Sequence, residues 1–488
     1  MKKIILTTLS IILLAGASTL RAENIGVPAE CEDVMLQAFY WDSYKTPSNL
    51  KYGSTTWTYL TKDSLAIREN FDLVWLPPSA KSKGGVGYYH YQLSDQGSQW
   101  GRKDLLQKLI ASLHRGGTKV LADIVINHRG DKDWCDFEKD VFGEGYGTFQ
   151  LETKHICYGD ECFYDTDSKC YNGQVRGNED TGTNDGGCRD LDHSNEYVQE
   201  WAKAYVRWMR DVMKYDGFRY DMTRGYAGKY LQMYNEAAQP YLSVSEFWTG
   251  IDDIVTHLAS TGYNTMAFDF PLKYQIGNAF SGSNYAKLKK NSNSLRGKNL
   301  SRYAVTFIDN HDTFERDEED ACNQEFIGCK VNLDDASVKD KILQANAYIL
   351  MMPGVPCVFY PHWAKYKEAI NALISVRKMA GIHSESVVSD EKGGSTTKYY
   401  SGRIQGHRGS VELRLGPKRS TEVPEGYHLA LDGAQYGSDF TIYVSDDTPT
   451  GVKEVNARIQ TEKFIKNGVL YIRHGEKVYD MMGRTVEK

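Results

Sequence analysis

Short apolar segments alternate with helical patterns along most of this chain, and this alternation restricts its fold more than any other feature. Amphipathic helical patterns such as Asp104–His114 and Val198–Lys214 lie between most of the apolar segments. Eight strands alternating with helices predict an α/β fold, a closed (β/α)8 TIM barrel. An open doubly wound sheet is the alternative, but no Gly-x-Gly-x-x-Gly follows the first strand. The candidate strands are Val34–Tyr40, Leu73–Leu76, Lys119–Ile126, Gly217–Tyr220, Leu242–Glu246, Thr265–Phe270, Tyr303–Phe307 and Val355–Tyr360.

The barrel pattern is interrupted after the third strand. Residues 128–190 are rich in Gly, Asp, Asn and Cys and have little apolar periodicity, so we expect an inserted irregular subdomain. A connection of this length in a compact domain is usually functional. In an exported protein its cysteines predict disulfides, although their pairing cannot be read from sequence. These cysteines are Cys135, Cys157, Cys162, Cys170 and Cys188.

The rest of the chain divides around this insertion. We expect the catalytic barrel to comprise residues 23–127 and 191–382. Beyond it the helical period gives way to short alternating pieces such as Ser410–Leu415, which predict a C-terminal antiparallel β domain over residues 383–448. Residues 449–488 form a linker and a tail with hairpin-like strands, either a sorting segment or a plain terminal hairpin.

The first 22 residues predict a signal peptide. Lys2 and Lys3 precede the apolar run Ile4–Leu14, small residues follow, and the run is too short to span a bilayer. We therefore expect a secreted protein, whether extracellular, periplasmic or attached to the cell surface. A net charge of −6 without a basic stripe predicts no nucleic-acid partner, and no later segment predicts a membrane span.

Acidic residues stand at the carboxyl ends of several predicted strands. Asp221 follows the fourth strand, Glu246 ends the fifth, and Asp312 lies just beyond the seventh. Barrel enzymes build their active sites at these ends. A single Asp between a strand and a helix is often only a helix cap. Carboxylates at the ends of three strands, with His128 and His311 beside them, instead indicate an active site.

Two carboxyl groups with different protonation states are what cleavage of a glycosidic bond requires. Arg219 lies two residues before Asp221 and shares its face of the strand, so its charge should lower the pKa of Asp221 and keep it ionised. Phe247 and Trp248 flank Glu246, and apolar surroundings would raise the pKa of Glu246 so that it can act as an acid.

Four segments, in this order, resemble the sequence regions of the α-amylase family of glycoside hydrolases, family thirteen, and look most similar to plant-type α-amylases. The resemblance covers about residues 33–385 and includes Gly87-Tyr88. It implies an enzyme, a secreted α-amylase that hydrolyses internal α-1,4-glucosidic bonds of starch by double displacement with retention of configuration. The four segments are Asp123–His128, Gly217–Gly225, Glu246 and Phe307–Asp312.

The resemblance also implies roles for single residues. Asp221 would be the nucleophile, Glu246 the general acid/base, and Asp312 a residue that stabilises the transition state. The implied substrate-binding residues are Tyr88, His128, Arg219, Arg224 and His311.

A calcium ion that holds the inserted subdomain to the barrel is the cofactor implied by the resemblance. Carboxylate, amide and carbonyl oxygens are the ligands that Ca²⁺ prefers. The implied ligands are Asn127, Asp180, Asp190 and the backbone carbonyl of Gly225. The expected partners are starch, amylose and maltodextrins, bound by a monomer.

Other functions remain open on the same scaffold. A transglycosylase or another α-glucan hydrolase would use the same three carboxylates. A non-catalytic glucan-binding relative would lack at least one of Asp221, Glu246 and Asp312, and this chain has all three. Tyr89-His90 departs from the family pattern, since relatives carry Met-Pro or Asp-Pro after the Gly-Tyr pair.

Overall fold

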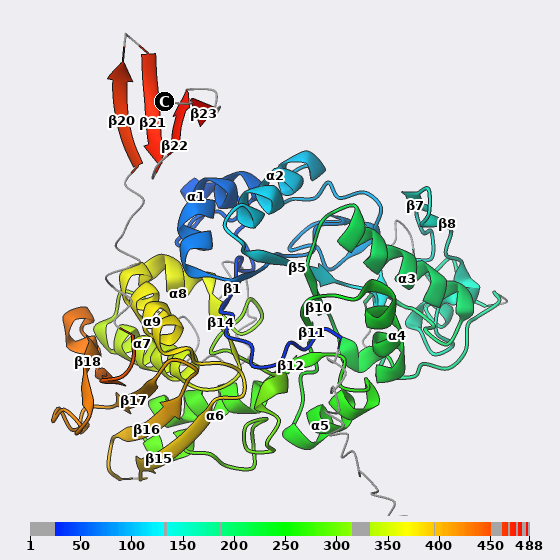
Figure 1. The fold of residues 1–488 in the computed structure, drawn as a ribbon. Helices are drawn as coiled ribbons and strands as arrows, with labels where there is room; N and C mark the ends of the chain where they lie inside the picture. The colour runs from blue at the N-terminus through cyan, green and yellow to red at the C-terminus, as the bar shows by residue number, and fades with distance from the viewer. Residues whose placement is uncertain are drawn as a thin grey trace, which may run out of the picture.

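The computed structural model describes residues 25–130, 134–172, 174–184, 187–314, 332–394 and 396–449, and the backbone of four strands between residues 461 and 486. The predicted signal peptide lies outside the described residues. Within the described part, a closed barrel of parallel strands stands beside an antiparallel sheet (Figure 1).

The barrel closes in the order β1-β2-β5-β10-β11-β12-β13-β14, and β14 pairs with β1 through Met35 and Cys357. All eight predicted strands are confirmed, although most are shorter than predicted. Nearly all their side chains are buried on both faces, as parallel strands covered by helices require. The strands are β1 Met35–Gln37, β2 Leu73–Trp75, β5 Lys119–Ile124, β10 Gly217–Tyr220, β11 Ser243–Ser245, β12 Met266–Phe268, β13 Ala304–Thr306 and β14 Val355–Phe359.

Helices surround the barrel strands (Figure 1). In α3 the buried residues Val198, Trp201, Ala202 and Tyr205 recur at helical spacing and face the core. The helix begins where the Asn195 side chain accepts from the Tyr197 N–H. The helices are α1 Trp57–Asn70, α2 Lys103–His114, α3 Glu196–Asp211, α4 Gly228–Ala238, α5 Ile251–Ser260, α6 Phe270–Ser281, α7 Ala336–Met351, α8 Tyr360–Lys365 and α9 Lys367–Ala380.

Two loops above the barrel contain short strand pairs. In the β2–α2 loop, β3 (Lys81–Ser82) pairs with β4 (His90–Gln92). In the inserted segment, β6 (His128–Arg129) pairs with β9 (Arg189–Asp190), so the segment leaves and rejoins the barrel at one place. A hairpin of β7 (Asp140–Gly143) and β8 (Gly147–Phe149) lies between them.

A disulfide and a buried ion pair stabilise the inserted segment. Cys135 and Cys170 form the disulfide, so the expected pairing is confirmed for these two cysteines, whereas Cys157 and Cys162 are buried free thiols. Arg129 Nη1 lies 2.7 Å from Asp140 Oδ2, and both side chains are fully buried. The Trp201 indole donates to the same carboxylate over 2.9 Å, so the hairpin is fastened to α3. Buried ion pairs are tolerated where further hydrogen bonds complete them.

The C-terminal sheet has the order β15-β16-β17-β19-β18 and is antiparallel, as predicted. Its edge strand β15 escaped the sequence pattern because its polar residues are mostly exposed. A further four-stranded antiparallel sheet follows, formed by β20 Thr461–Lys466, β21 Val469–His474, β22 Lys477–Asp480 and β23 Thr485–Val486. The five-stranded sheet consists of β15 Val387–Gly393, β16 Tyr400–Gln405, β17 Ser410–Leu415, β18 Tyr427–Asp432 and β19 Phe440–Ser445.

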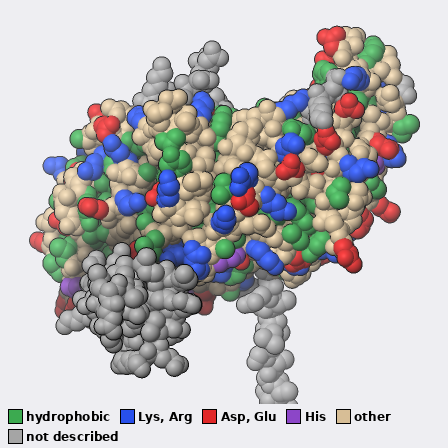
Figure 2. Space-filling model, turned by 90° about the horizontal axis from the view of Figure 1, so that it is seen from above, with side chains coloured by type: hydrophobic (Ala, Val, Ile, Leu, Met, Phe, Trp, Pro, Cys, Tyr) green, Lys and Arg blue, Asp and Glu red, His purple; other side chains and the backbone are tan. Residues whose placement is uncertain are grey.

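Acidic and basic side chains lie interspersed on the face shown in Figure 2. This agrees with the small net charge of the chain. Among the described residues, every helix is too short or too polar to cross a membrane.

Candidate active site

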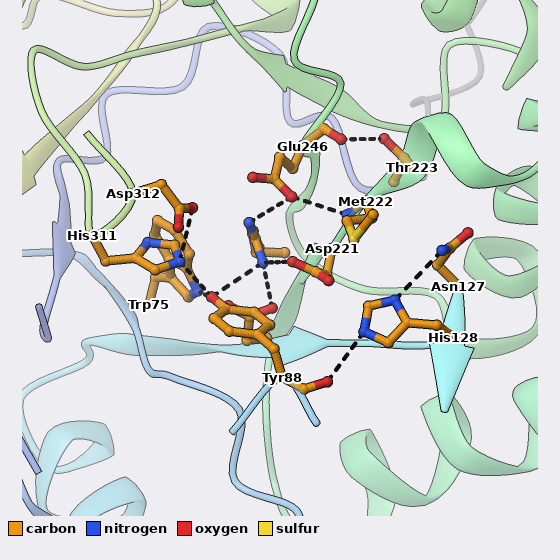
Figure 3. A network of polar contacts seen from close by, with 12 residues as sticks. Trp75, Tyr88, Asn127, His128, Asp221, Met222, Thr223, Glu246, His311 and Asp312 are labelled. Atoms are coloured by element: carbon orange, nitrogen blue, oxygen red, sulfur yellow. Dashed lines mark hydrogen bonds and ion pairs between the residues drawn. The ribbon is translucent and has the colours of Figure 1, made fainter. Parts of the chain in front are cut away.

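One buried arginine contacts carboxylates at the carboxyl ends of three neighbouring strands. Arg219, on β10, places Nη1 2.7 Å from both Asp123 Oδ1 and Asp221 Oδ1. Its Nη2 lies 2.9 Å from Glu246 Oε2, just beyond β11. β5, β10 and β11 are adjacent in the barrel, so their ends bring residues distant in sequence together. Asp312 lies across the site beside His311, and its side chain is 21% exposed (Figure 3).

A hydrogen-bonded chain connects His311 to this cluster. Gln37 Nε2 lies 3.0 Å from His311 Nδ1, and His311 Nε2 lies 2.7 Å from the Tyr88 hydroxyl and 3.1 Å from Asp312 Oδ2. The Tyr88 hydroxyl donates to Asp123 Oδ2 over 2.9 Å. If the Gln37 amide donates, His311 is neutral with its proton on Nε2, and each bond in the chain has one donor.

Sequence reasoning assigned no role to two members of this network. The Asp123 carboxylate accepts hydrogen bonds from Arg219, the Tyr88 hydroxyl and the Trp75 indole, so it orients the Arg219 guanidinium. Gln37 orients His311. Asp123 lies within the Asp123–His128 segment that resembles the family, and its place near the end of the predicted strand Lys119–Ile126 was a usable signal. Gln37 carried no signal beyond being an amide in an otherwise apolar strand.

The turn after β10 connects Asp221 to Glu246. Met222 has φ 44° and ψ 49°, a left-handed conformation that is costly for a residue with a side chain. In this conformation the Met222 N–H donates to Glu246 Oε2 over 2.9 Å. Thr223 holds the same residue through its backbone, because its hydroxyl donates to the Glu246 carbonyl over 2.7 Å. The turn therefore fixes both ends of Glu246.

Burial raises the pKa values of the three carboxyl groups that contact Arg219. The pKa of Asp221 rises to about 7, because burial and the charges of Asp123 and Asp312 outweigh the lowering by Arg219. The expectation of a lowered pKa for Asp221 is therefore wrong, although Arg219 acts in the expected direction. The pKa of Glu246 rises to about 7 through burial and the charge of Asp221, as predicted, and that of Asp123 rises to about 6.

The remaining predicted substrate contacts lie around this cluster. His128 is buried, with Nε2 3.1 Å from the Tyr88 carbonyl oxygen. Tyr88 is half-buried and stacks on His311 at 5.4 Å between ring centroids. Arg224 is exposed, and its Nη1 donates to the Trp248 carbonyl over 3.2 Å, so it lies at the edge of the site beyond Glu246.

The candidate calcium ligands meet where the inserted segment joins the barrel. Asn127 Nδ2 lies 3.4 Å from Asp190 Oδ1. A Cβ atom on Gly225 would lie 1.8 Å from Asn127 Oδ1, so the Gly225 backbone contacts that amide. The loop that carries Asp180 reaches the same place, because a Cβ atom on Gly182 would lie 2.3 Å from the Gly225 carbonyl carbon.

The chemistry of these residues fits Ca²⁺. They supply two carboxylates, an amide and a backbone carbonyl, all oxygen donors. Burial raises the pKa of the Cys157 thiol, and the charges of Asp180 and Asp190 raise it further, so negative charge converges here. A side chain at Gly225 would fill the space beside Asn127.

Comparison with known proteins identifies the family of this chain. The family model of the alpha-amylase catalytic domain matches residues 69–392. The chain belongs to the alpha-amylase family. As a member of this family it is a glycoside hydrolase. Membership of the alpha-amylase family is consistent with the barrel fold.

Relatives within the alpha-amylase family confirm the plant-type resemblance. "Alpha-amylase 3, chloroplastic" of Arabidopsis thaliana is 30% identical over 83% of this chain, which spans 44% of that protein. "Probable alpha-amylase 2" of the same plant is 29% identical over 83% of this chain, which spans 93% of that protein. The structure of an alpha-amylase from Malbranchea cinnamomea covers 86% of this chain and 97% of its own, with a TM-score of 0.61 and 15% identity, and shares the fold.

Proposed function

We propose that this glycoside hydrolase is a secreted α-amylase that cleaves internal α-1,4-glucosidic bonds of starch, amylose and maltodextrins with retention of configuration. The observation that carries the proposal is the single guanidinium of Arg219 that contacts both Asp221 and Glu246. Retaining glycosidases place two carboxyl groups close together, with one as nucleophile and the other as acid. Two neighbouring carboxyl groups with pKa values near 7 share protons in the way that this division needs.

In the first step, Asp221 attacks the anomeric carbon while Glu246 donates its proton to the leaving oxygen. The ester bond to Asp221 forms as the glycosidic bond breaks, and the leaving sugar departs as an alcohol. In the second step, Glu246 removes a proton from water, the water oxygen attacks the anomeric carbon, and Asp221 leaves as a carboxylate. Two inversions give net retention.

The other side chains bind and orient the sugar. Asp312 and His311 would hold hydroxyl groups of the sugar at the cleaved bond, with Tyr88 stacked on its ring and His128 on the opposite side. Arg219 would keep Asp221 directed at the anomeric carbon. Arg224 would contact the sugar on the far side of the bond, since it lies beside Trp248 beyond Glu246.

Asn127, Asp180, Asp190 and the Gly225 carbonyl would hold Ca²⁺. When bound, the ion would supply structural stability by fastening the inserted segment to the turn that follows Asp221. The chemical steps of the reaction are carried out by protein side chains.

Incubation with amylose, pullulan and short maltodextrins tests the function. We expect early loss of iodine colour from amylose, mixed oligosaccharides, and newly formed reducing ends in the α configuration, followed by NMR. Products in the β configuration would overturn the retaining mechanism. Transfer products without a net gain of reducing ends would favour a transglycosylase. For export, the N-terminal sequence of protein recovered outside the cytoplasm should begin near residue 23.

A further inference from the structure

A second cluster of potential ligands lies far from the catalytic carboxylates in sequence and fold. Glu30 belongs to the segment before β1, His383 follows α9, and His407 lies in the turn between β16 and β17. One ligand atom from each of these residues lies within 4.8 Å of the other two. Three chain segments, two from the barrel side and one from the C-terminal sheet, therefore meet at this point.

The two imidazole rings of this cluster face each other. The ring centroids of His383 and His407 are 4.1 Å apart, and the rings are inclined by only 17°. Burial and the neighbouring His407 lower the pKa of His383, which favours its neutral form. The neutral imidazole is the form that binds metal ions. Two protonated rings at this distance would repel each other.

Each ring nitrogen of His407 faces a carboxylate, so a cation bound at Nε2 would lie between His407 and Glu30. His407 Nδ1 lies 3.0 Å from Glu32 Oε1, and Nε2 lies 3.5 Å from Glu30 Oε2. A proton on Nδ1, donated to Glu32, leaves the Nε2 lone pair directed at the Glu30 side. Histidine ligands of metals commonly donate their second N–H to a carboxylate in this way. Arg408 also binds Glu32, so its positive charge is neutralised beside the cluster.

We propose that Glu30, His383 and His407 bind a divalent transition metal of the zinc class. Two imidazoles and one carboxylate suit zinc, and this donor set differs from the all-oxygen set at Asn127 and Asp190. Ligands of a tetrahedral ion at about 2.1 Å are roughly 3.4 Å apart, so the cluster must contract on binding. Glu30 and His407 are exposed, so their side chains have more room to move on binding than the buried His383.

His383 also has a ring nitrogen available for this role. Its Nδ1 lies 3.3 Å from the Glu385 N–H, a long and therefore weak contact. Coordination through Nε2 moves the ring proton to Nδ1 and gives up that weak contact. The bound ion would join the segment before the first barrel strand to the C-terminal sheet, so its expected effect is on stability rather than on turnover.

Metal titration of calcium-loaded protein, freed of transition metals, tests the proposal. The probes are Zn²⁺, followed by melting temperature, and Co²⁺, followed by visible absorption of a tetrahedral complex. Glu30→Gln and His407→Ala alter exposed side chains, so both variants should fold. His428→Ala is the matched control, because His428 is an exposed histidine of the same sheet that pairs with Asp446.

We expect Zn²⁺ at about 100-fold its Kd to raise the melting temperature of the native protein and of His428→Ala by roughly 2–4 °C. Glu30→Gln should weaken binding and His407→Ala should abolish both the shift and the cobalt absorption. Equal shifts in His407→Ala and the native protein would overturn the proposal, as would the absence of any shift. Amylolytic activity should be the same in all four proteins at saturating calcium.

Discussion

Arg219 Nη1 lies 2.7 Å from Asp221 Oδ1, and the same nitrogen lies 2.7 Å from Asp123 Oδ1. With Glu246 on Nη2, one buried cation faces three buried carboxyl groups. If all three were ionised, the cluster would carry an excess of two negative charges away from water. This excess explains why the pKa values of Asp221 and Glu246 rise to about 7 despite direct contact with an arginine.

Asp221→Asn should abolish turnover of starch, by at least 10³-fold in kcat, because the amide keeps the shape but cannot form the glycosyl ester. The melting temperature should fall little or rise. The measurement is reducing-end release together with thermal unfolding.

Glu246→Gln should behave differently from Asp221→Asn toward activated substrates. In an aryl maltoside, an acidic phenol can leave as the phenolate without being protonated. Glu246→Gln should therefore retain far more activity on such a substrate than on starch. Asp221→Asn should lose activity on both, because each needs the nucleophile. The opposite pattern would exchange the two proposed roles.

Arg219→Lys should lower kcat/KM by about 100-fold or more and also lower the melting temperature. A lysine has one compact ammonium group and cannot bind three carboxylates through a planar fork. Arg224→Lys is the control, because Arg224 is exposed and contacts the Trp248 carbonyl rather than the acids. Its effect should be about tenfold at most, seen chiefly in KM. Comparable losses in both variants would contradict a central role for Arg219.

The stability of the protein should depend on pH through Glu246. Its pKa rises from 4.5 to about 7 on folding, so the folded state keeps a proton that the unfolded state has already lost. The favourable contribution of Glu246 to the free energy of unfolding is complete below about pH 4.5 and is lost as the pH rises through 7. The free energy of unfolding changes by about 1.4 kcal/mol per unit of pKa shift, so roughly 3 kcal/mol of stability is lost by pH 8.

Glu246→Gln removes this titration. The melting temperature of the variant relative to the native protein should therefore be higher at pH 8 than at pH 5. Thermal unfolding at the two pH values, with calcium constant, measures this. A difference of the opposite sign would show that Glu246 is not the group with the raised pKa.

Gly225→Ala should weaken calcium binding and lower the melting temperature in calcium by several degrees, because its Cβ would lie 1.8 Å from Asn127 Oδ1. Gly159→Ala, in the inserted segment, is the matched control, since its Cβ would meet nothing within 4 Å. Removal of calcium with a chelator should destabilise the native protein and Gly159→Ala alike, and Gly225→Ala much less. A native melting curve unchanged by chelation would remove the proposed calcium site.

The sequence predicted the barrel well because the strands are apolar runs buried on both faces. It missed β15 because an exposed edge strand needs no apolar alternation. The positions of Asp221 and Glu246 followed from the ends of those strands. The pKa of Asp221 did not, since Asp123 and Asp312 approach it from other strands. Likewise, no local pattern could join His383 and His407 to Glu30, because only the fold brings them together.

The turn from Asp221 to Gly225 is held in place by contacts at both of its ends and at its second residue. Its first residue contacts Arg219, its second holds Glu246 through a left-handed backbone, and its last touches the Asn127 amide. An inserted or deleted residue in this turn would displace all three of these contacts at once. Redesign of the proposed calcium site must therefore proceed from the inserted segment and leave the turn intact.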